Sequence, residues 1–141
     1  MPALILALHE NKRNADQVTE SLRRSGFKVL ETSSFAKAII MLQTQSVDLI
    51  LSDVHLENGG SVFDFLRWVK KNPSTKATPF VLFSSDPTAV AKFFEDGVRT
   101  SARMLGASMY ITMEVFDAEE FRKQIDSLLP LELKQTHNST P

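Results

Sequence analysis

Short apolar runs alternate with amphipathic helical stretches five times along this chain of 141 residues. The apolar runs lie at residues 3–8, 27–32, 47–52, 79–83 and 109–112, and each is followed by apolar residues spaced three or four apart. A short, nearly continuous apolar run is typical of a strand that is covered on both faces. Strictly alternating strands and helices therefore predict a doubly wound α/β fold, with one five-stranded parallel sheet and helices on both sides.

Capping residues mark the starts of the predicted helices. An N-cap side-chain oxygen accepts a hydrogen bond from an N–H group of the first turn, and proline is favoured at the first helical position. The sequence offers these caps: Ser33 or Ser34, Ser61, Asp86 before Pro87, and Asp117 with Glu120 in a variant capping box. Gly26 and Gly106 follow the helical patterns at residues 14–25 and 86–105 and predict their ends.

Composition describes an ordinary globular protein, with 43% hydrophobic and 23% charged residues. The formal net charge of −1 and the lack of a basic stripe argue against nucleic-acid binding. The chain has no cysteine, which excludes disulfides and thiolate metal sites and fits the cytoplasm. No apolar run approaches the roughly 20 residues that span a bilayer, so we expect no membrane partner. We expect one folded domain at residues 1–130 and a flexible polar tail at 131–141.

Polar residues stand at the ends of several predicted strands. In doubly wound sheets, ligands gather at the C-terminal ends of the strands. Glu10 and Asp53 follow two different strands, and Ser84 follows a third. Two neighbouring carboxylates favour a divalent cation with oxygen ligands, and such a cation prepares an aspartate for phosphoryl transfer. No glycine-rich phosphate loop follows the first strand, which argues against nucleotide binding.

With its alternating elements and with Glu10, Asp53 and Ser84 in this order and spacing, the chain resembles the receiver domains of bacterial response regulators, including the chemotaxis regulators, along residues 3 to 130. Asp53 follows Asp-Leu-Ile-Leu-Ser, as the phosphoacceptor does in that family, and Ser84 matches the switch hydroxyl. Tyr110 ends the run Gly-Ala-Ser-Met-Tyr and matches the aromatic switch residue. His9 and Glu10 fall on the family's acidic pair.

The resemblance implies a flavodoxin-like sheet of order 2-1-3-4-5 with five helices, and a role in two-component phosphorelay signalling rather than enzyme catalysis. It implies that Asp53 accepts phosphate from a histidine kinase or a histidine phosphotransfer protein. We find no interdomain linker in the sequence and therefore expect a stand-alone receiver domain. Mg²⁺ would be held by Glu10, Asp53 and the backbone carbonyl of His55. The surface of the fourth helix, fifth strand and fifth helix would bind a downstream protein, and homodimerisation is left open.

Three departures from the family pattern identify an atypical member. Met113-Glu114 stands where the family has a lysine, usually followed by proline, and methionine cannot supply a point charge to phosphoryl oxygens. His9 replaces the first acid, and a neutral imidazole suits zinc, copper or nickel better than magnesium. We therefore expect weakened Mg²⁺ binding. The segment from Ser84 to Gly106 is about two helical turns longer than usual, at 3.6 residues per turn, which predicts an extended fourth helix and an altered choice of partner.

Several alternatives stay open at this point. The chain could be a pseudo-receiver, a protein–protein interaction module that signals without phosphate, or more remotely a small α/β enzyme. Asp53 could cap a strand end, Glu10 could be a solvated loop carboxylate, and His9 could be a hydrogen-bonded substitute rather than a metal ligand. Lys70 and Lys71 are interpreted as a solvated helix end.

Overall fold

Strands and helices alternate along the chain in the predicted way. The computed structural model describes residues 3–9, 12–54, 62–84, 89–113 and 115–130, and the side chains of all of these except 12–15 and 89–95. In chain order the elements are β1 (Leu4–Leu8), α1 (Lys12–Arg24), β2 (Lys28–Thr32), α2 (Phe35–Thr44), β3 (Leu49–Asp53), α3 (Val62–Lys71), β4 (Phe80–Ser84), α4 (Ala89–Met104), β5 (Met109–Thr112) and α5 (Ala118–Asp126).

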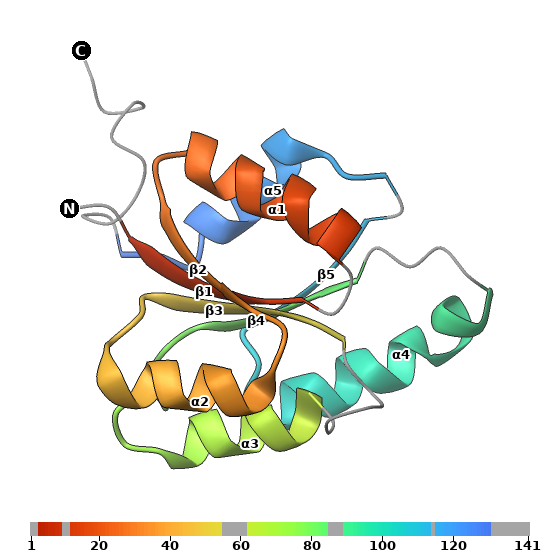
Figure 1. The fold of residues 1–141 in the computed structure, drawn as a ribbon. Helices are drawn as coiled ribbons and strands as arrows, with labels where there is room; N and C mark the ends of the chain where they lie inside the picture. The colour runs from red at the N-terminus through yellow and green to blue at the C-terminus, as the bar shows by residue number, and fades with distance from the viewer. Residues whose placement is uncertain (1–2, 10–11, 55–61, 85–88, 114, 131–141) are drawn as a thin grey trace.

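The five strands form one parallel sheet in the order β2-β1-β3-β4-β5, which confirms the predicted order. Helices α1 and α5 cover one face of the sheet, and α2, α3 and α4 cover the other (Figure 1). All the strands therefore end at the same edge, with β1, β3 and β4 in the middle of it. None of the described helices is both long and apolar enough to cross a membrane.

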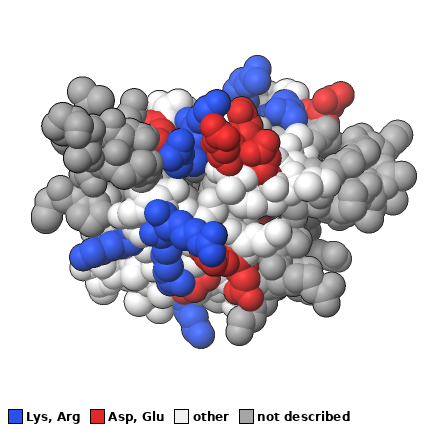
Figure 2. Space-filling model, turned by 90° about the horizontal axis from the view of Figure 1, so that it is seen from above, with Lys and Arg blue, Asp and Glu red and all other residues white. Residues whose placement is uncertain are grey.

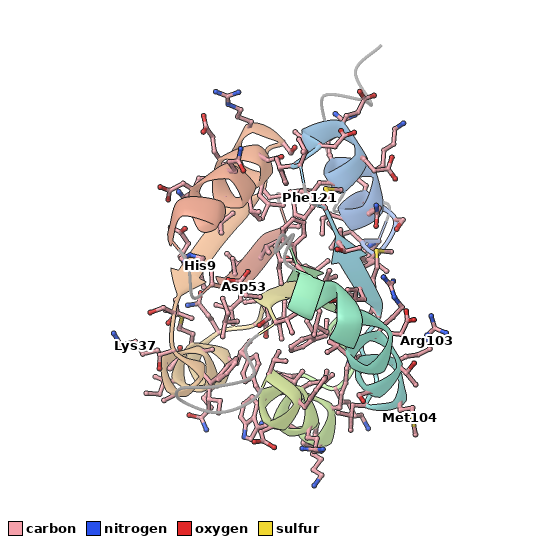
Figure 3. All side chains as sticks on the ribbon, turned by 90° about the vertical axis from the view of Figure 1, so that its right-hand side faces the viewer. His9, Lys37, Asp53, Arg103, Met104 and Phe121 are labelled. Atoms are coloured by element: carbon pink, nitrogen blue, oxygen red, sulfur yellow. The ribbon has the colours of Figure 1, made fainter. Side chains whose placement is uncertain are left out.

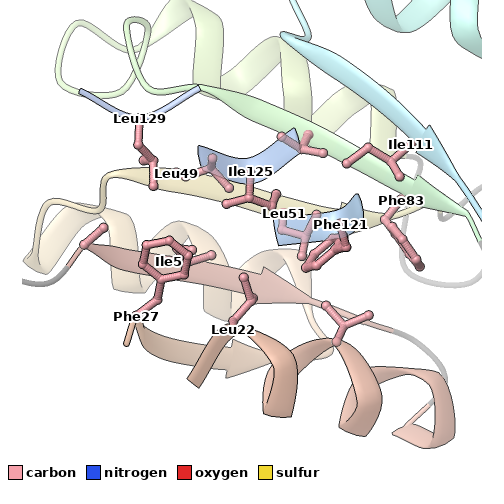
Figure 4. Packing of buried hydrophobic residues seen from close by; sticks show 13 residues of the cluster. Ile5, Leu22, Phe27, Leu49, Leu51, Phe83, Ile111, Phe121, Ile125 and Leu129 are labelled. Carbon is pink, nitrogen blue, oxygen red and sulfur yellow. The ribbon is translucent and has the colours of Figure 1, made fainter. Parts of the chain in front are cut away.

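Two hydrophobic clusters fill the space on either side of the sheet. Under α1 and α5, Phe121 and Ile125 are fully buried and pack with alternate strand residues such as Ile5 and Leu49 (Figure 4). The other cluster contains the intervening strand residues, such as Leu6 on β1, and the buried faces of α2 and α3. Because successive strand residues point to opposite faces, one run of apolar residues supplies both clusters.

Local signals set several of the observed boundaries. The side chain of Ser34, rather than Ser33, caps α2 by accepting from Lys37 N at 3.3 Å. Asp117 caps α5 by accepting from Glu120 N at 3.1 Å. Gly26 and Gly106 follow α1 and α4 with φ values of 94° and 102°, a backbone region that suits glycine. The predicted caps at Ser61 and Asp86, and the predicted tail at 131–141, lie outside the described residues.

Some boundaries differ from the prediction. Asp53 and Ser84 are the last residues of β3 and β4 rather than the first residues beyond them. Helix α5 ends at Asp126, three residues before the end of the predicted apolar face, and Ser127 is its C-cap. Beyond the cap the hydrogen bonds span three residues instead of four, because Leu128 N donates to Ile125 O and Leu129 N donates to Asp126 O. Helix α1 begins at Lys12 and ends at Arg24, whereas the sequence pattern covers residues 14–25. Each predicted end therefore lies within one helical turn of the observed end.

Helix α4 is the longest of the described helices, with 16 residues. At 1.5 Å per residue it is about 24 Å long. Its C-terminal half packs on the sheet through Ala102, which is fully buried, and Leu105, directly after the helix, packs against the same cluster. Its N-terminal turns reach past the strand ends (Figure 1). The predicted extension of this helix is therefore placed beside the edge where the strands end.

Candidate functional site

The predicted site residues stand on neighbouring strands at the C-terminal edge of the sheet. Asp53 ends β3, which lies between β1 and β4, and Ser84 ends β4. The register pairs Leu8 with Ser52, so that His9 and Asp53 come next on their two strands. Figure 3 looks onto this edge and shows both residues near its centre. The sequence prediction that these strand ends share one edge is confirmed by the sheet order and register.

His9 and Asp53 line the same small cavity, together with Thr19 of α1 and Phe83 of β4. Its volume is about 10 Å³, which is close to the space that one water molecule occupies. Both side chains are partly buried, and Phe83 forms part of the apolar wall that continues into the core under α5. Asp53 is therefore a partly buried carboxylate next to the hydrophobic core rather than a fully exposed surface group.

The ring of His9 is held by a carboxylate from β2. Its Nε2 atom lies 3.3 Å from Glu31 Oε1, and the His9 side chain is only 17% exposed. Because β1 lies between β2 and β3, this contact directs the distal ring nitrogen away from Asp53. Glu31 was not singled out from the sequence, since 22 residues separate it from His9 and no motif links them.

Two further donors converge on Glu31. Thr19 Oγ1 donates to Glu31 Oε1 at 2.8 Å, and an Arg23 nitrogen lies 3.5 Å from Glu31 Oε2. Partial burial by itself raises the pKa of the Glu31 carboxyl. The hydrogen bonds from Thr19 and His9, together with the charge of Arg23, outweigh that effect and hold the pKa below its usual value. Glu31 is therefore an ionised anchor for the His9 ring at neutral pH.

The end of β5 supplies an apolar side chain where the family resemblance calls for a lysine. Met113 is partly buried and packs against the core under α5. Its backbone N–H donates to Ser84 O at 2.9 Å, which ties the ends of β4 and β5 together. The Ser84 side chain is partly buried beside this contact. The structure thus brings Asp53 and Ser84 to one edge, with a thioether rather than an ammonium group at the adjoining strand end.

Tyr110 lies two residues before the end of β5 and is joined to α4. The guanidinium carbon of Arg99 is 4.7 Å from the centre of the Tyr110 ring, and Arg99 Nη1 donates to Tyr110 O at 3.4 Å. The Tyr110 ring also packs against the core under α3 and α4. Arg99 is a second residue that the sequence motifs did not indicate, because a cation–π contact between a helix and a strand has no fixed spacing.

Glu10 and His55, the other predicted metal ligands, lie outside the described residues, and so does Glu114. Among the residues that the structure does describe, no three His, Asp or Glu side chains are close enough to hold a metal ion. The described part of the site therefore offers the carboxylate of Asp53 and the imidazole of His9, which is already hydrogen-bonded to the carboxylate of Glu31. The predicted cation site requires the side chains of Asp53 and Glu10 to lie close together, and this proximity stays a prediction.

Comparison with known proteins adds a fold but no sequence family. No protein-family model matches the chain, and no curated protein matches it significantly. Solved structures do match. Chemotaxis response regulator CheY4 of Vibrio cholerae superposes with a TM-score of 0.76 at 21% identity, over 92% of this chain and 100% of that one.

Two further matches are receiver domains of histidine kinases. The signal receiver domain of a kinase from Syntrophus aciditrophicus gives a TM-score of 0.73 at 24% identity, over 90% of this chain and 89% of that one. The receiver domain of a sensor kinase from Pseudomonas aeruginosa, described with a magnesium ion in its active-site cleft, gives 0.73 at 16% identity, over 91% and 98%. The chain thus has the fold of response-regulator receiver domains.

Proposed function

We propose that this chain is a receiver module of a two-component pathway and that Asp53 is its phosphoacceptor. The observation that carries the proposal is the position of Asp53 at the end of the central strand β3, at the edge where this class of sheet binds ligands. The phosphoryl donor is a histidine kinase or a histidine phosphotransfer protein in the cytoplasm. The output surface is formed by α4, β5 and α5, and it binds a downstream protein.

In the proposed reaction, a carboxylate oxygen of Asp53 attacks the phosphorus of a phosphohistidine. The new O–P bond forms as the P–N bond breaks, and the released imidazole takes up a proton. The hydroxyl of Ser84, at the end of the next strand, then donates to a phosphoryl oxygen. Met113 supplies no positive charge to these oxygens, so we expect the acyl phosphate to form slowly or to be short-lived.

A magnesium ion would supply charge neutralisation to the incoming phosphoryl group. Mg²⁺ prefers oxygen ligands, and Asp53 provides one among the described residues. Glu10 and the His55 carbonyl are proposed to complete the set. His9 carries an imidazole, which has no oxygen to offer, and its Nε2 already lies at Glu31. This supports the expectation that the ion binds more weakly than at a pair of acids.

The test of the phosphoacceptor is intact mass measurement after incubation with acetyl phosphate and Mg²⁺. We expect the wild-type chain to gain one phosphoryl group and Asp53→Asn to gain none. Asp117→Asn is the matched control, because asparagine also caps a helix and the same chemical change is made at the start of α5 instead of at the end of β3. A chain that gains no phosphate, or an Asp53→Asn variant that still gains it, would contradict the proposal.

The alternative function is a pseudo-receiver that binds its partner without phosphate. Two observations favour it: Met113 packs into the core at the lysine position, and His9 is tied to Glu31. This alternative predicts that unphosphorylated wild type and Asp53→Asn retain the same proteins from a cell extract, identified by mass spectrometry. Loss of a partner from the Asp53→Asn sample would rule it out.

A further inference from the structure

A groove between α4 and β5 concentrates positive charge. Its volume is about 260 Å³, and its lining includes Arg99 and Arg103 of α4, Ser108 directly before β5, and Met109 and Tyr110 on β5. Among the lining residues that the structure describes, there are two arginines and no carboxylate. Arg99 and Arg103 are four residues apart, so they lie about one turn apart on the same side of α4.

The two arginines play different parts in this groove. Arg99 is partly buried and stacks on the Tyr110 ring, with its guanidinium carbon 4.7 Å from the ring centre. Arg103, one turn further along, is exposed and lies toward the outer side of α4 (Figure 3). A guanidinium group is a planar fork of donors that matches the two oxygens of a carboxylate, and it combines this with stacking on an aromatic ring.

Charge distinguishes this groove from the larger one between α1 and α5. That groove has a volume of about 610 Å³, and its lining includes Glu20 and Arg24 from α1 and Glu119 and Arg122 from α5. Figure 2 shows this face, with acidic and basic side chains mixed on it. Mixed signs select neither an acidic nor a basic ligand, whereas the groove between α4 and β5 favours an acidic one.

We propose that the groove between α4 and β5 binds an acidic segment of a partner protein, whose carboxylates pair with Arg99 and Arg103. The inference rests on the proposed function, because it gives the chemistry of the downstream partner for the output surface. Arg99 is joined to Tyr110 through its ring and its carbonyl oxygen. A partner carboxylate that pairs with Arg99 therefore changes the contact between Arg99 and Tyr110, the residue proposed as the aromatic switch. A change in the conformation of Tyr110 in turn moves Arg99 and alters the groove.

The test is selection from a random library of twelve-residue peptides displayed on phage, followed by fluorescence anisotropy with the enriched peptide made synthetically. We expect the enriched sequences to contain at least two Asp or Glu residues. We expect R99Q/R103Q to bind the enriched peptide at least tenfold more weakly, and Arg103→Gln alone, an exposed change that leaves Tyr110 in place, to weaken it several-fold. Replacing the peptide's acidic residues with amides should have the same effect.

The matched control is R24Q/R67Q, which removes two arginines from α1 and α3 and gives the same net charge. It should bind the enriched peptide as wild type does. Enrichment of basic or purely apolar peptides, no enrichment at all, or unchanged binding by R99Q/R103Q would overturn the inference. Concentration-dependent dimerisation that R99Q/R103Q abolishes would also overturn it, because a second copy would then occupy the groove. Phosphorylation of Asp53 is measured separately by intact mass, so failure of the groove and failure of the phosphoacceptor can be told apart.

Discussion

Met113 shows how one side chain can alter the chemistry of an otherwise suitable strand edge. It packs against apolar residues under α5, at the position where the receiver resemblance calls for a lysine. We predict that Met113→Lys lengthens the lifetime of phosphate on Asp53, because the lysine stem can follow the same apolar surface while its ammonium group reaches the phosphoryl oxygens. The expected gain is about tenfold, which corresponds to roughly 1.4 kcal/mol.

The measurement for Met113→Lys is the decay of the phosphorylated mass with time after the phosphodonor is removed. Met104→Lys is the control, since Met104 is 81% exposed near the C-terminus of α4 and the substitution adds the same charge. An equal effect of the two substitutions would mean that net charge, rather than position, governs the lifetime.

The carboxylate of Glu31 contributes to stability in a way that depends on pH. Folding lowers its pKa, so its contribution to stability is present above the ordinary value of 4.5 and is lost as the pH falls through the lower value of the folded state. We expect Glu31→Gln to reduce the free energy of unfolding at about pH 7 by about 0.5 kcal/mol, a small figure because the side chain is 34% exposed to screening water. The difference from wild type should shrink as the pH falls below 4.5.

Urea unfolding at several pH values measures this effect, and Glu119→Gln, an exposed substitution on α5, serves as the reference. A deficit for Glu31→Gln that stays constant down to acid pH would show that lost packing, not lost charge, is responsible. The contacts of Glu31 and Arg99 could not be found in the sequence. Each joins residues from different elements, and neither contact recurs at a characteristic spacing.

At the scale of elements, Gly106 links the end of α4 to α3. Its φ is +102°, and a Cβ atom there would lie 3.2 Å from Lys70 Cγ. The Lys70 side chain has little room to move, because its Nζ donates to Lys76 O at 3.2 Å and to Thr78 O at 2.9 Å. Lys71 is exposed in the last turn of α3, as interpreted for the pair, but Lys70 is partly buried. Burial lowers the pKa of Lys70, and its two hydrogen bonds brace the turn between α3 and β4.

We predict that Gly106→Ala lowers the free energy of unfolding by about 1–2 kcal/mol, the cost of a left-handed backbone conformation for a residue with a Cβ atom. Gly97→Ala should have the opposite sign and add about 0.5–1 kcal/mol. Gly97 lies within α4, and a Cβ atom there would meet nothing within 4 Å. Chemical denaturation of both variants checks the pair, and a loss of stability in Gly97→Ala would mean that this part of α4 is not helical in solution.

The whole molecule is organised around a sheet whose two faces belong to separate hydrophobic clusters. Because both clusters use the same five strands, we expect them to unfold together. Phe121→Ala, which empties a fully buried site under α5, should cost about 3–5 kcal/mol. Fluorescence of Trp68, which stacks on Phe65 on the opposite side of the sheet, should report the same shift as circular dichroism.

Val115→Ala is the control for Phe121→Ala, since Val115 is 85% exposed in the loop before α5 and its truncation should leave stability nearly unchanged. Separate transitions for Trp68 fluorescence and circular dichroism would show that the two layers are independent units. That outcome would contradict the idea of a single cooperative fold.

The sequence pattern was sufficient to predict the order of elements and the shared strand edge, because buried parallel strands leave a strong apolar signature. The strand order followed from the resemblance to receiver domains and is confirmed. The pattern also placed Asp53 and Ser84 at that edge. It did not predict where the His9 ring turns, since that depends on a carboxylate from β2. The ends of helices were the weakest part, as at α5, because capping geometry decides them within a turn.

The edge strand β2 has one further consequence. It carries the exposed charged residues Lys28 and Glu31 near its two ends, and within the described part of the chain it pairs only with β1. Another chain that added a strand to the sheet at this edge would have to desolvate the charged groups of Lys28 and Glu31 in order to form backbone hydrogen bonds with β2. The same carboxylate that anchors the His9 ring therefore also helps to guard the protein against polymerisation through its open flank.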